Sequence, residues 1–312
     1  MKTLYIIGNG FDRAHNLPTS YECFRMWLME TGRSYFVENM ETFFSRWDRD
    51  SKKDLLWNDF ESALGACDFE ETYNMFANQS REYFGEGYEY LRDIRNISDE
   101  HFTMPLTYEM PSLFIEWIKS INAKIPNISP NNLILRNVNN SDLFLNFNFT
   151  DTLEQVYGIS YPQVCHIHNR VSVGETPIVG HNQTFSIEVP GDMTMDESKL
   201  KQSLADVLNG YKKDYKTNIA NNSGFYRQID EQVTTLCFYG HSLGDIDLPY
   251  FENIKKMVSS DAQWKFYIYQ GENGQCLERN KKALQEFIKK MHLDKQQCKA
   301  FDSKNMNQGI VL

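Results

Sequence analysis

The sequence predicts an α/β protein with a parallel sheet, helices on both faces of the sheet and a large helical insertion. Two observations carry this expectation. Short apolar runs alternate along the chain with segments of helical periodicity, and small or polar residues follow most of those runs. The chain is also long enough, since 312 residues, 41% of them hydrophobic, can bury a large core without disulfides or metals.

The first predicted strand is the apolar run of residues 4–7, which has no polar alternation and therefore suits the interior of a parallel sheet. It ends at the turn Gly8-Asn9-Gly10. Thr19 and Glu22 then have the spacing of a capping box, and apolar residues at helical spacing continue to Gly32. This part of the chain predicts a strand, a glycine turn and a helix.

Residues 34–128 have a mostly helical pattern, are rich in aromatic side chains and contain no convincing strand. We expect a helical insertion here, with aromatic stripes that form its own core. A second, smaller helical insertion is expected at 190–230. Both insertions interrupt a single domain of residues 1–312.

Further strands are predicted at residues 142–148, 164–168, 177–180, 234–239 and 264–269. Helices are predicted at residues 150–157, 248–257 and 277–291. Strands that alternate with helices in this way are typical of a Rossmann-like parallel sheet, in which ligands bind at the carboxyl ends of the strands.

Composition argues against several classes of protein. The formal net charge of −10 disfavours a broad surface for nucleic acid. Six scattered cysteines without a CxxC pair predict neither a zinc ribbon nor a disulfide framework, and Cys165 and Cys237 lie in apolar runs typical of reduced core thiols. No signal peptide and no membrane-spanning stretch are evident. We therefore expect a cytoplasmic protein that does not bind membranes.

The first candidate site motif, Gly8-Asn9-Gly10-Phe11-Asp12, directly follows the first strand. Glycines there allow a tight turn and a close approach of a ligand, and N–H groups near a helix start favour phosphate. Arg13 occupies the place of the third glycine in the dinucleotide-binding fingerprint. A simple turn from strand to loop is the alternative interpretation.

The second motif, residues 146–154, follows another predicted strand. Alternation along the strand would place Asn146 and Asn148 on one face of the sheet. Two amides buried there need partners, which can be backbone groups or a ligand. Thr150 or Asp151 can cap the following helix.

Histidines form the third motif. Strand alternation would point His166 and His168 to the same face, where one could act as a general base. The pair could also be half of a metal site.

The fourth motif, residues 240–247, follows the predicted strand at 234–239. We expect Asp247 to cap the next helix, while Ser242 and Asp245 can hydrogen-bond to hydroxyl or phosphate groups. A loop stabilised by its own Asx turns is the alternative.

As an ordered set, these motifs resemble the AbiH family, which is associated with abortive infection, a bacterial defence against bacteriophage. The resemblance extends from residue 1 to about residue 270 and rests on residues 4–12, 17–21, 57–61, 146–154, 166–168 and 240–243. AbiH proteins in turn resemble sirtuin-like NAD-binding proteins.

This resemblance implies roles for individual residues. Gly8 and Gly10 match the loop that holds the NAD phosphates in the wider group. Asn148 matches the asparagine that contacts the nicotinamide ribose, and His168 matches the catalytic base. The segment 240–242 is similar to a late loop that contacts the adenosine part.

The sequence also departs from the pattern of those relatives. Thr150 stands where they have Asp, so that contact is lost or passes to Asp151. Asn169 replaces the glycine after the catalytic histidine, and Asp12 would repel a pyrophosphate unless it faces away. The zinc-binding cysteines and the peptide-substrate module of deacetylating sirtuins are absent from the sequence, which argues against deacetylation.

We therefore expect an antiphage defence protein that binds NAD and hydrolyses its nicotinamide–ribose bond without a metal. Asn148 and His168 are the expected catalytic residues. The other expected ligand-binding residues are Gly8, Asn9, Gly10, Phe11, Asp12, Asn146, Thr150, Asp151, His166, Gly240, His241, Ser242 and Asp245.

Two alternatives stay open. The crevice could hold NAD, ADP-ribose or another nucleotide as a signal without chemistry, which the departures at Thr150 and Asn169 favour. It could instead serve a metal-dependent phosphodiesterase or nuclease whose ligands are His166, His168, His181, His241 and Asp245. The chain could also form a homo-oligomer and respond to a phage trigger that the sequence does not identify.

Overall fold

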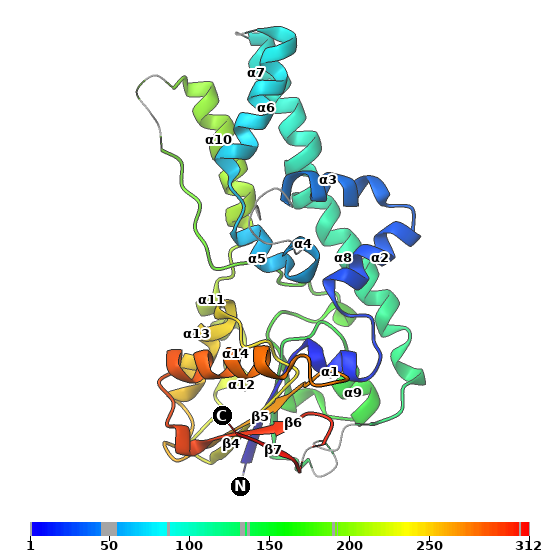
Figure 1. The fold of residues 1–312 in the computed structure, drawn as a ribbon, viewed down its shortest axis with the longest axis vertical. Coiled ribbons are helices and arrows are strands. Elements are labelled where there is room, and N and C mark those ends of the chain that lie inside the picture. Colours follow the sequence, from blue (N-terminus) through cyan, green and yellow to red (C-terminus); the bar gives the residue numbers. More distant parts are fainter. Residues whose placement is uncertain are drawn as a thin grey trace. The chain divides into compact units, whose positions relative to one another are not determined.

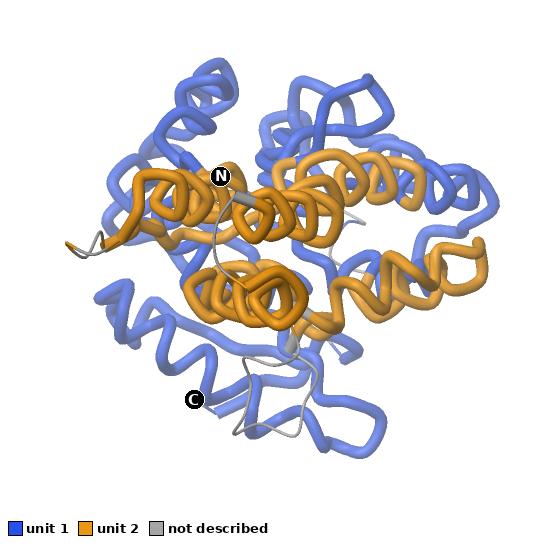
Figure 2. The backbone as a smooth tube through the Cα atoms, turned by 90° about the horizontal axis from the view of Figure 1, so that it is seen from above, with its two compact units in different colours: residues 1–19, 118–177, 214–312 blue, residues 20–117, 178–213 orange. Residues whose placement is uncertain are grey.

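A computed structural model describes residues 2–44, 55–85, 88–131, 135, 138–188, 191, 193–305 and 307–311. The chain divides into two compact units, coloured separately in Figure 2. The first unit contains residues 1–19, 118–177 and 214–312, and the second contains residues 20–117 and 178–213.

The first unit is built on a seven-stranded sheet (Figure 1). Its strands are β1 (Lys2–Ile7), β2 (Leu143–Asn146), β3 (Val164–His166), β4 (Val233–Tyr239), β5 (Gln263–Ile268), β6 (Cys298–Asp302) and β7 (Gly309–Ile310). Their order across the sheet is β3-β2-β1-β4-β5-β6-β7, and every pair is parallel except β6 with β7. The predicted α/β class with a parallel sheet is confirmed.

Both faces of this sheet are covered, because β1 at its centre alternates between two cores. Leu4 and Ile6 pack in one core with side chains of α12 (Ser223–Tyr226), α13 (Leu248–Lys255) and α14 (Leu277–Lys290). Tyr5 and Ile7 pack in the other core with Phe11 and Leu153. Those two residues belong to the short helices α1 (Asn9–Ala14) and α9 (Thr152–Tyr157).

The second unit is helical. It contains α2 (Tyr21–Glu30), α3 (Ser34–Phe44), α4 (Leu55–Asn58), α5 (Phe60–Gly65), α6 (Phe69–Phe84), α7 (Tyr88–Ser98), α10 (Met195–Gly210) and most of α8 (Met110–Asn122). Phe24 lies at its centre and contacts the rings of Trp57, Phe114 and Trp117. The aromatic side chains therefore form the core of this unit, as expected. That residues 34–128 and 190–230 are insertions into a single domain stays a prediction.

The predictions for residues 177–180 and for the start of the first long helix are wrong. Residues 177–180 form no strand, and only an isolated bridge joins His181 to Lys212. The main-chain N–H of Gly180 instead donates a hydrogen bond to a side chain, at Glu61 Oε1, over 2.9 Å. The helix at α2 begins one residue later than expected, with Ser20 rather than Thr19 accepting from an N–H of the first turn.

All six cysteines are free thiols, and burial raises the pKa of Cys165 and Cys237 to about 12 each. This agrees with the expected reduced state of these two core residues. In the part of the chain that the structure describes, no helix combines the length and the apolar character needed to cross a membrane.

The close packing of Gly10 generates a stability prediction. A Cβ atom at Gly10 would lie 2.6 Å from the Cα atom of Gly240, so neither backbone can yield cheaply. Gly10→Ala should lower the free energy of unfolding by at least about 2 kcal/mol in chemical denaturation. Gly224→Ala, in α12, meets no atom closer than 4.0 Å and should be neutral or slightly stabilising. Equal stability of the two variants would contradict this account.

Candidate active site

The strand order reverses between β1 and β4, and the loops that follow these two strands interlock there. A Cβ atom at Gly8 would lie 2.5 Å from the Cα atom of His241, and one at Gly240 would lie 2.3 Å from the Phe11 nitrogen. Gly240 also has a φ of +69°, in the left-handed region that glycine tolerates best. The glycines therefore allow two backbones to touch at the switch point.

In this contact, N–H groups of the glycine turn donate to backbone carbonyls and are therefore not available to bind phosphate. Gly8 donates to the Tyr239 carbonyl at 3.0 Å and Gly10 to the Gly240 carbonyl at 2.8 Å. Asn9 uses its amide on the Thr19 carbonyl at 2.9 Å. The interpretation as a turn between strand and helix thus accounts for both glycines, and a pyrophosphate would need other donors.

Asp12 is fully buried and turned towards the segment after β2. Its carboxylate accepts hydrogen bonds from the hydroxyls of Thr150 and Thr152. Burial is the main cause that raises the pKa of Asp12, to about 6, against the lowering effect of these two bonds. The carboxylate thus has protein partners, and Thr150 supplies one of them.

The two strand-end asparagines find backbone partners. The Asn146 side-chain oxygen accepts from the main-chain nitrogen of Asn148 at 3.0 Å. The Asn148 amide donates to the Gly8 carbonyl at 3.2 Å, and both residues are buried. This bond ties the end of β2 to the glycine turn after β1 and fixes the orientation of the Asn148 side chain.

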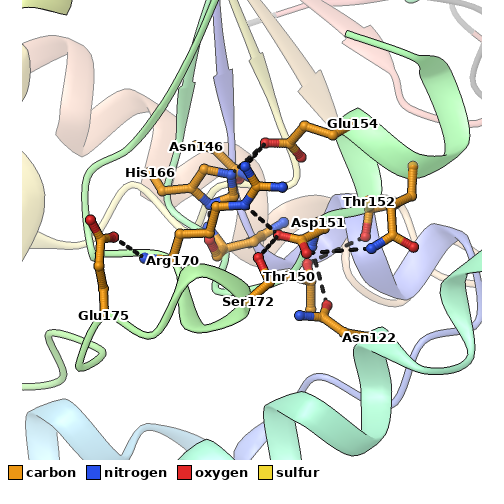
Figure 3. A network of polar contacts seen from close by, with 12 residues as sticks. Asn122, Asn146, Thr150, Asp151, Thr152, Glu154, His166, Arg170, Ser172 and Glu175 are labelled. Carbon is orange, nitrogen blue, oxygen red and sulfur yellow. Dashed lines mark hydrogen bonds and ion pairs between the residues drawn. The ribbon is translucent and has the colours of Figure 1, made fainter. Parts of the chain in front are cut away.

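His166, the last residue of β3, belongs to a polar network drawn in Figure 3. One ring nitrogen lies 2.8 Å from Glu154 Oε1, and the other lies 3.2 Å from the carbonyl oxygen of Asn148. A carbonyl oxygen can only accept, so the bond to Asn148 requires a proton on His166 Nδ1.

Asp151 anchors the other side of this network. It occupies the N-cap position of α9 but makes no side-chain cap bond. Its carboxylate instead accepts from Arg170 Nε at 2.7 Å and from the Ser172 hydroxyl at 3.0 Å. Arg170 also lies 3.8 Å from Glu154. The prediction that the Asp151 side chain caps α9 is therefore wrong, because its carboxylate binds the guanidinium of Arg170 instead.

A second group of ionisable side chains surrounds Asp247. His168 Nε2 lies 3.7 Å from Asp247 Oδ1, and His241 Nε2 lies 3.3 Å from Asp247 Oδ2. All three residues are buried or nearly so. Phe147 contacts both imidazole rings, with ring centroids 5.3 Å from His168 and 4.5 Å from His241. The carboxylate and its two imidazoles are thus packed against an aromatic ring in a site with little access to water.

The backbone fixes the tautomer of His241. Its Nδ1 accepts a hydrogen bond from the Leu243 N–H at 2.9 Å, so a neutral ring carries its proton on Nε2, which faces Asp247. Leu243 has a φ of +61°, an uncommon conformation for a residue with a branched side chain. The expectation that Asp247 caps α13 with its side chain is wrong, since no cap bond is present.

The predicted shared face of His166 and His168 is also wrong. β3 ends at His166, and the chain turns at Ile167 and His168 before Asn169 adopts a φ of +69°. Strand alternation therefore does not apply to the pair, and the rings contact different carboxylates. Asn169 adopts the left-handed conformation that glycine favours and asparagine tolerates.

The four residues of the metal hypothesis in the first unit, His166, His168, His241 and Asp245, do not form a ligand group with one another. Among the described residues, the one group of three ligands close enough for an ion is Asp151, Glu154 and His166, whose atoms lie within 4.8 Å of one another. Arg170 already contacts this group. Asp245 pairs with Lys290 at 2.6 Å, and in the second unit His181 accepts from, or donates to, main-chain groups with both ring nitrogens.

Some residues of the site were not predicted. Glu154 and Arg170 complete the network around His166, and Asp247 was expected only as a cap. Among the expected ligand residues, Phe11 is fully buried in the core, while Ser242 is exposed in the loop after β4. The spacing of Asp151 and Glu154 on the first turn of α9 was the available signal for a paired carboxylate site.

A family model described as "Bacteriophage abortive infection AbiH" matches residues 4–268. The chain belongs to the AbiH family. The matched part includes both carboxylate groups of the site, and this AbiH protein is thereby linked to abortive infection by bacteriophage. No curated protein and no solved structure matched the chain.

Burial of Asp12 predicts a pH dependence of stability. Because the pKa is raised in the folded protein, the stabilising contribution of the protonated carboxyl is present below about pH 4 and lost as the pH rises through about 6. Asp12→Asn removes this loss. Its stability relative to the wild type should rise by up to about 3 kcal/mol between pH 4 and pH 8 in urea unfolding. The exposed Asp261→Asn should show no such trend, and a flat profile for Asp12→Asn would refute the prediction.

Asn169 allows a test of the turn after His168. Asn169→Gly and Asn169→Ala both lose the bond from the side-chain amide to the Thr176 carbonyl, but only alanine is strained at a positive φ. The glycine variant should be the more stable of the two by about 1 kcal/mol in thermal unfolding. Alanine equal to or better than glycine would show that the left-handed turn is not maintained.

Proposed function

We propose that this AbiH protein binds NAD at the switch point between β1 and β4 and hydrolyses the nicotinamide–ribose bond as part of antiphage defence. One observation carries the proposal: the buried His168 faces the carboxylate of Asp247 at the carboxyl ends of the strands. The strand order β3-β2-β1-β4-β5-β6 supports a nucleotide in this place, because it is the order of dinucleotide-binding sheets.

His168 is the proposed general base, and Asp247 is the proposed positioning residue. His241 Nε2 lies 3.3 Å from one carboxylate oxygen, and His168 Nε2 lies 3.7 Å from the other. A carboxylate beside an imidazole selects its tautomer and stabilises the imidazolium after proton uptake. The separation of 3.7 Å exceeds a hydrogen bond, as is common before a substrate tightens the site.

In this proposal, the bond between the ribose C1′ and the nicotinamide nitrogen breaks, and nicotinamide leaves with the bonding electrons. A water oxygen bonds to C1′ as its proton passes to His168 and then to solvent, which yields ADP-ribose. The oxocarbenium-like state resembles that of other glycosidic cleavages. Asn148 would orient the water and the ribose hydroxyls with its carbonyl oxygen, while its amide stays on the Gly8 carbonyl.

The glycine turn does not fit the fingerprint that holds a pyrophosphate, since the Gly8 and Gly10 N–H groups are taken by backbone carbonyls. The proposal therefore rests on the side chains at the strand ends. A nucleotide sensor without chemistry is the second candidate, because the backbone bonds of Asn146 and Asn148 also suit a rigid binding site. The two candidates differ in turnover.

Purified wild-type protein should release nicotinamide from NAD, as measured by chromatography. His168→Ala should lower kcat at least about 100-fold, which is typical for the loss of a general base. Asp247→Asn should lower kcat about tenfold or more and alter its pH profile, because the base loses its orienting charge. Asn148→Ala should also lower kcat.

His292→Asn, at an exposed histidine remote in sequence from every motif, is the matched control and should keep full activity. Circular dichroism melting would establish that each variant is folded. Wild-type rates in folded His168→Ala would contradict the proposal, and NAD binding without nicotinamide release would favour the sensor.

A further inference from the structure

The first unit contains a pocket of about 280 Å³ beside the edge strand β3. Its walls come from β3 and the turn after it, from residues 161–162 and from residues 221–228 at α11 (Tyr215–Asn221) and α12. Two strands separate β3 from β4, so this pocket is distinct from the switch point. Its wall includes His166 and Arg170 of the network in Figure 3.

The pocket wall is rich in hydrogen-bond acceptors. Asn169, Asn222 and Gln228 each donate a side-chain N–H to a main-chain carbonyl, at 2.8, 2.9 and 3.4 Å. A carbonyl oxygen can only accept, so these bonds fix which end of each amide is nitrogen. In the described part of the chain, the three amide oxygens accept no hydrogen bond and remain for a ligand.

Carboxylates outnumber the guanidinium around the pocket. Glu175, Arg170 and His166 lie on the wall, and Asp151 and Glu154 contact Arg170 from outside the lining. The guanidinium is held by those two carboxylates, at 2.7 and 3.8 Å, which leaves the charge of Glu175 without a guanidinium partner. Among the described residues, the one hydrogen-bond donor to Glu175 is the main-chain nitrogen of Arg170, at 2.8 Å.

An aromatic ring completes the wall. Tyr161 is 65% exposed, and the Arg170 guanidinium already lies 5.7 Å from its ring centroid. Rings in such a position attract cations through the negative face of the π system. Amide oxygens, an exposed carboxylate and a tyrosine ring together match one kind of ligand, a small cation that carries several N–H donors.

We propose that this pocket binds a small aliphatic amine or guanidine as an effector. Its N–H groups would bond to the amide oxygens of Asn169, Asn222 and Gln228, and its charge would face Glu175. The bound cation would lie against His166. One ring nitrogen of His166 contacts the carbonyl oxygen of Asn148, so binding of the cation can change the position of Asn148 near the switch point. Binding itself does not rest on the proposed NAD chemistry.

Isothermal titration calorimetry at low ionic strength provides the test, with agmatine and putrescine as probes. The neutral four-carbon diol and succinate are controls of matched length and different charge. We expect saturable binding of agmatine or putrescine and none of the controls. Equal heats from the cations and the diol, or binding of succinate instead, would overturn the proposal.

Substitutions at two exposed glutamates distinguish binding in the pocket from a general attraction of cations to an acidic protein. Glu175→Gln keeps the shape and the bond to Arg170 but removes the charge, and should weaken binding about tenfold. Glu231→Gln changes the net charge equally at an exposed site outside the pocket and should leave the affinity unchanged. Equal weakening in both variants would show that the cations respond only to net charge.

Discussion

The contact between the glycine turn after β1 and the loop after β4 sets the geometry of everything around the switch point. Gly8, Gly10 and Gly240 bring the two backbones within a distance that no Cβ atom tolerates. In this contact, the N–H groups of Gly8 and Gly10 donate to backbone carbonyls, and His241 is placed in the site. The Gly8 carbonyl accepts a hydrogen bond from the Asn148 amide. Glycines in this place therefore serve the protein's own packing, and chemistry falls to the side chains of the neighbouring strand ends.

Two helix N-caps show how those side chains are arranged. Asp151 is the N-cap residue of α9 and Asp247 is the N-cap residue of α13, yet neither makes a side-chain cap bond. A missing cap costs about 1 kcal/mol, and both carboxylates are used instead to hold a guanidinium or a pair of imidazoles. A helix start after a strand of a parallel sheet lies at the edge where ligands bind, so the same residue type can serve either purpose.

The sequence alone predicts the α/β class, because buried parallel strands are apolar runs that need no tertiary information. It misses β6, where a short run includes Lys299 and ends at Asp302, and it misplaces His168, because only the three-dimensional structure shows that β3 ends at His166. Asp247 illustrates the harder limit. Its position predicts a cap, and only the proximity of His241, six residues earlier in the chain, shows that its carboxylate is engaged elsewhere. Rules based on neighbouring residues cannot say which of two partners a carboxylate will bind when the second partner comes close only in the folded protein.

The most direct test of this account is NMR of the imidazole nitrogens in the folded protein. The account predicts that neutral His241 is protonated on Nε2, and that Asp247→Asn shifts the ring signals of both His241 and His168. Asp245→Asn, a matched change at a residue paired with Lys290, should shift neither. Protonation of His241 on Nδ1, or His168 signals indifferent to Asp247→Asn, would show that the carboxylate does not join the two imidazoles.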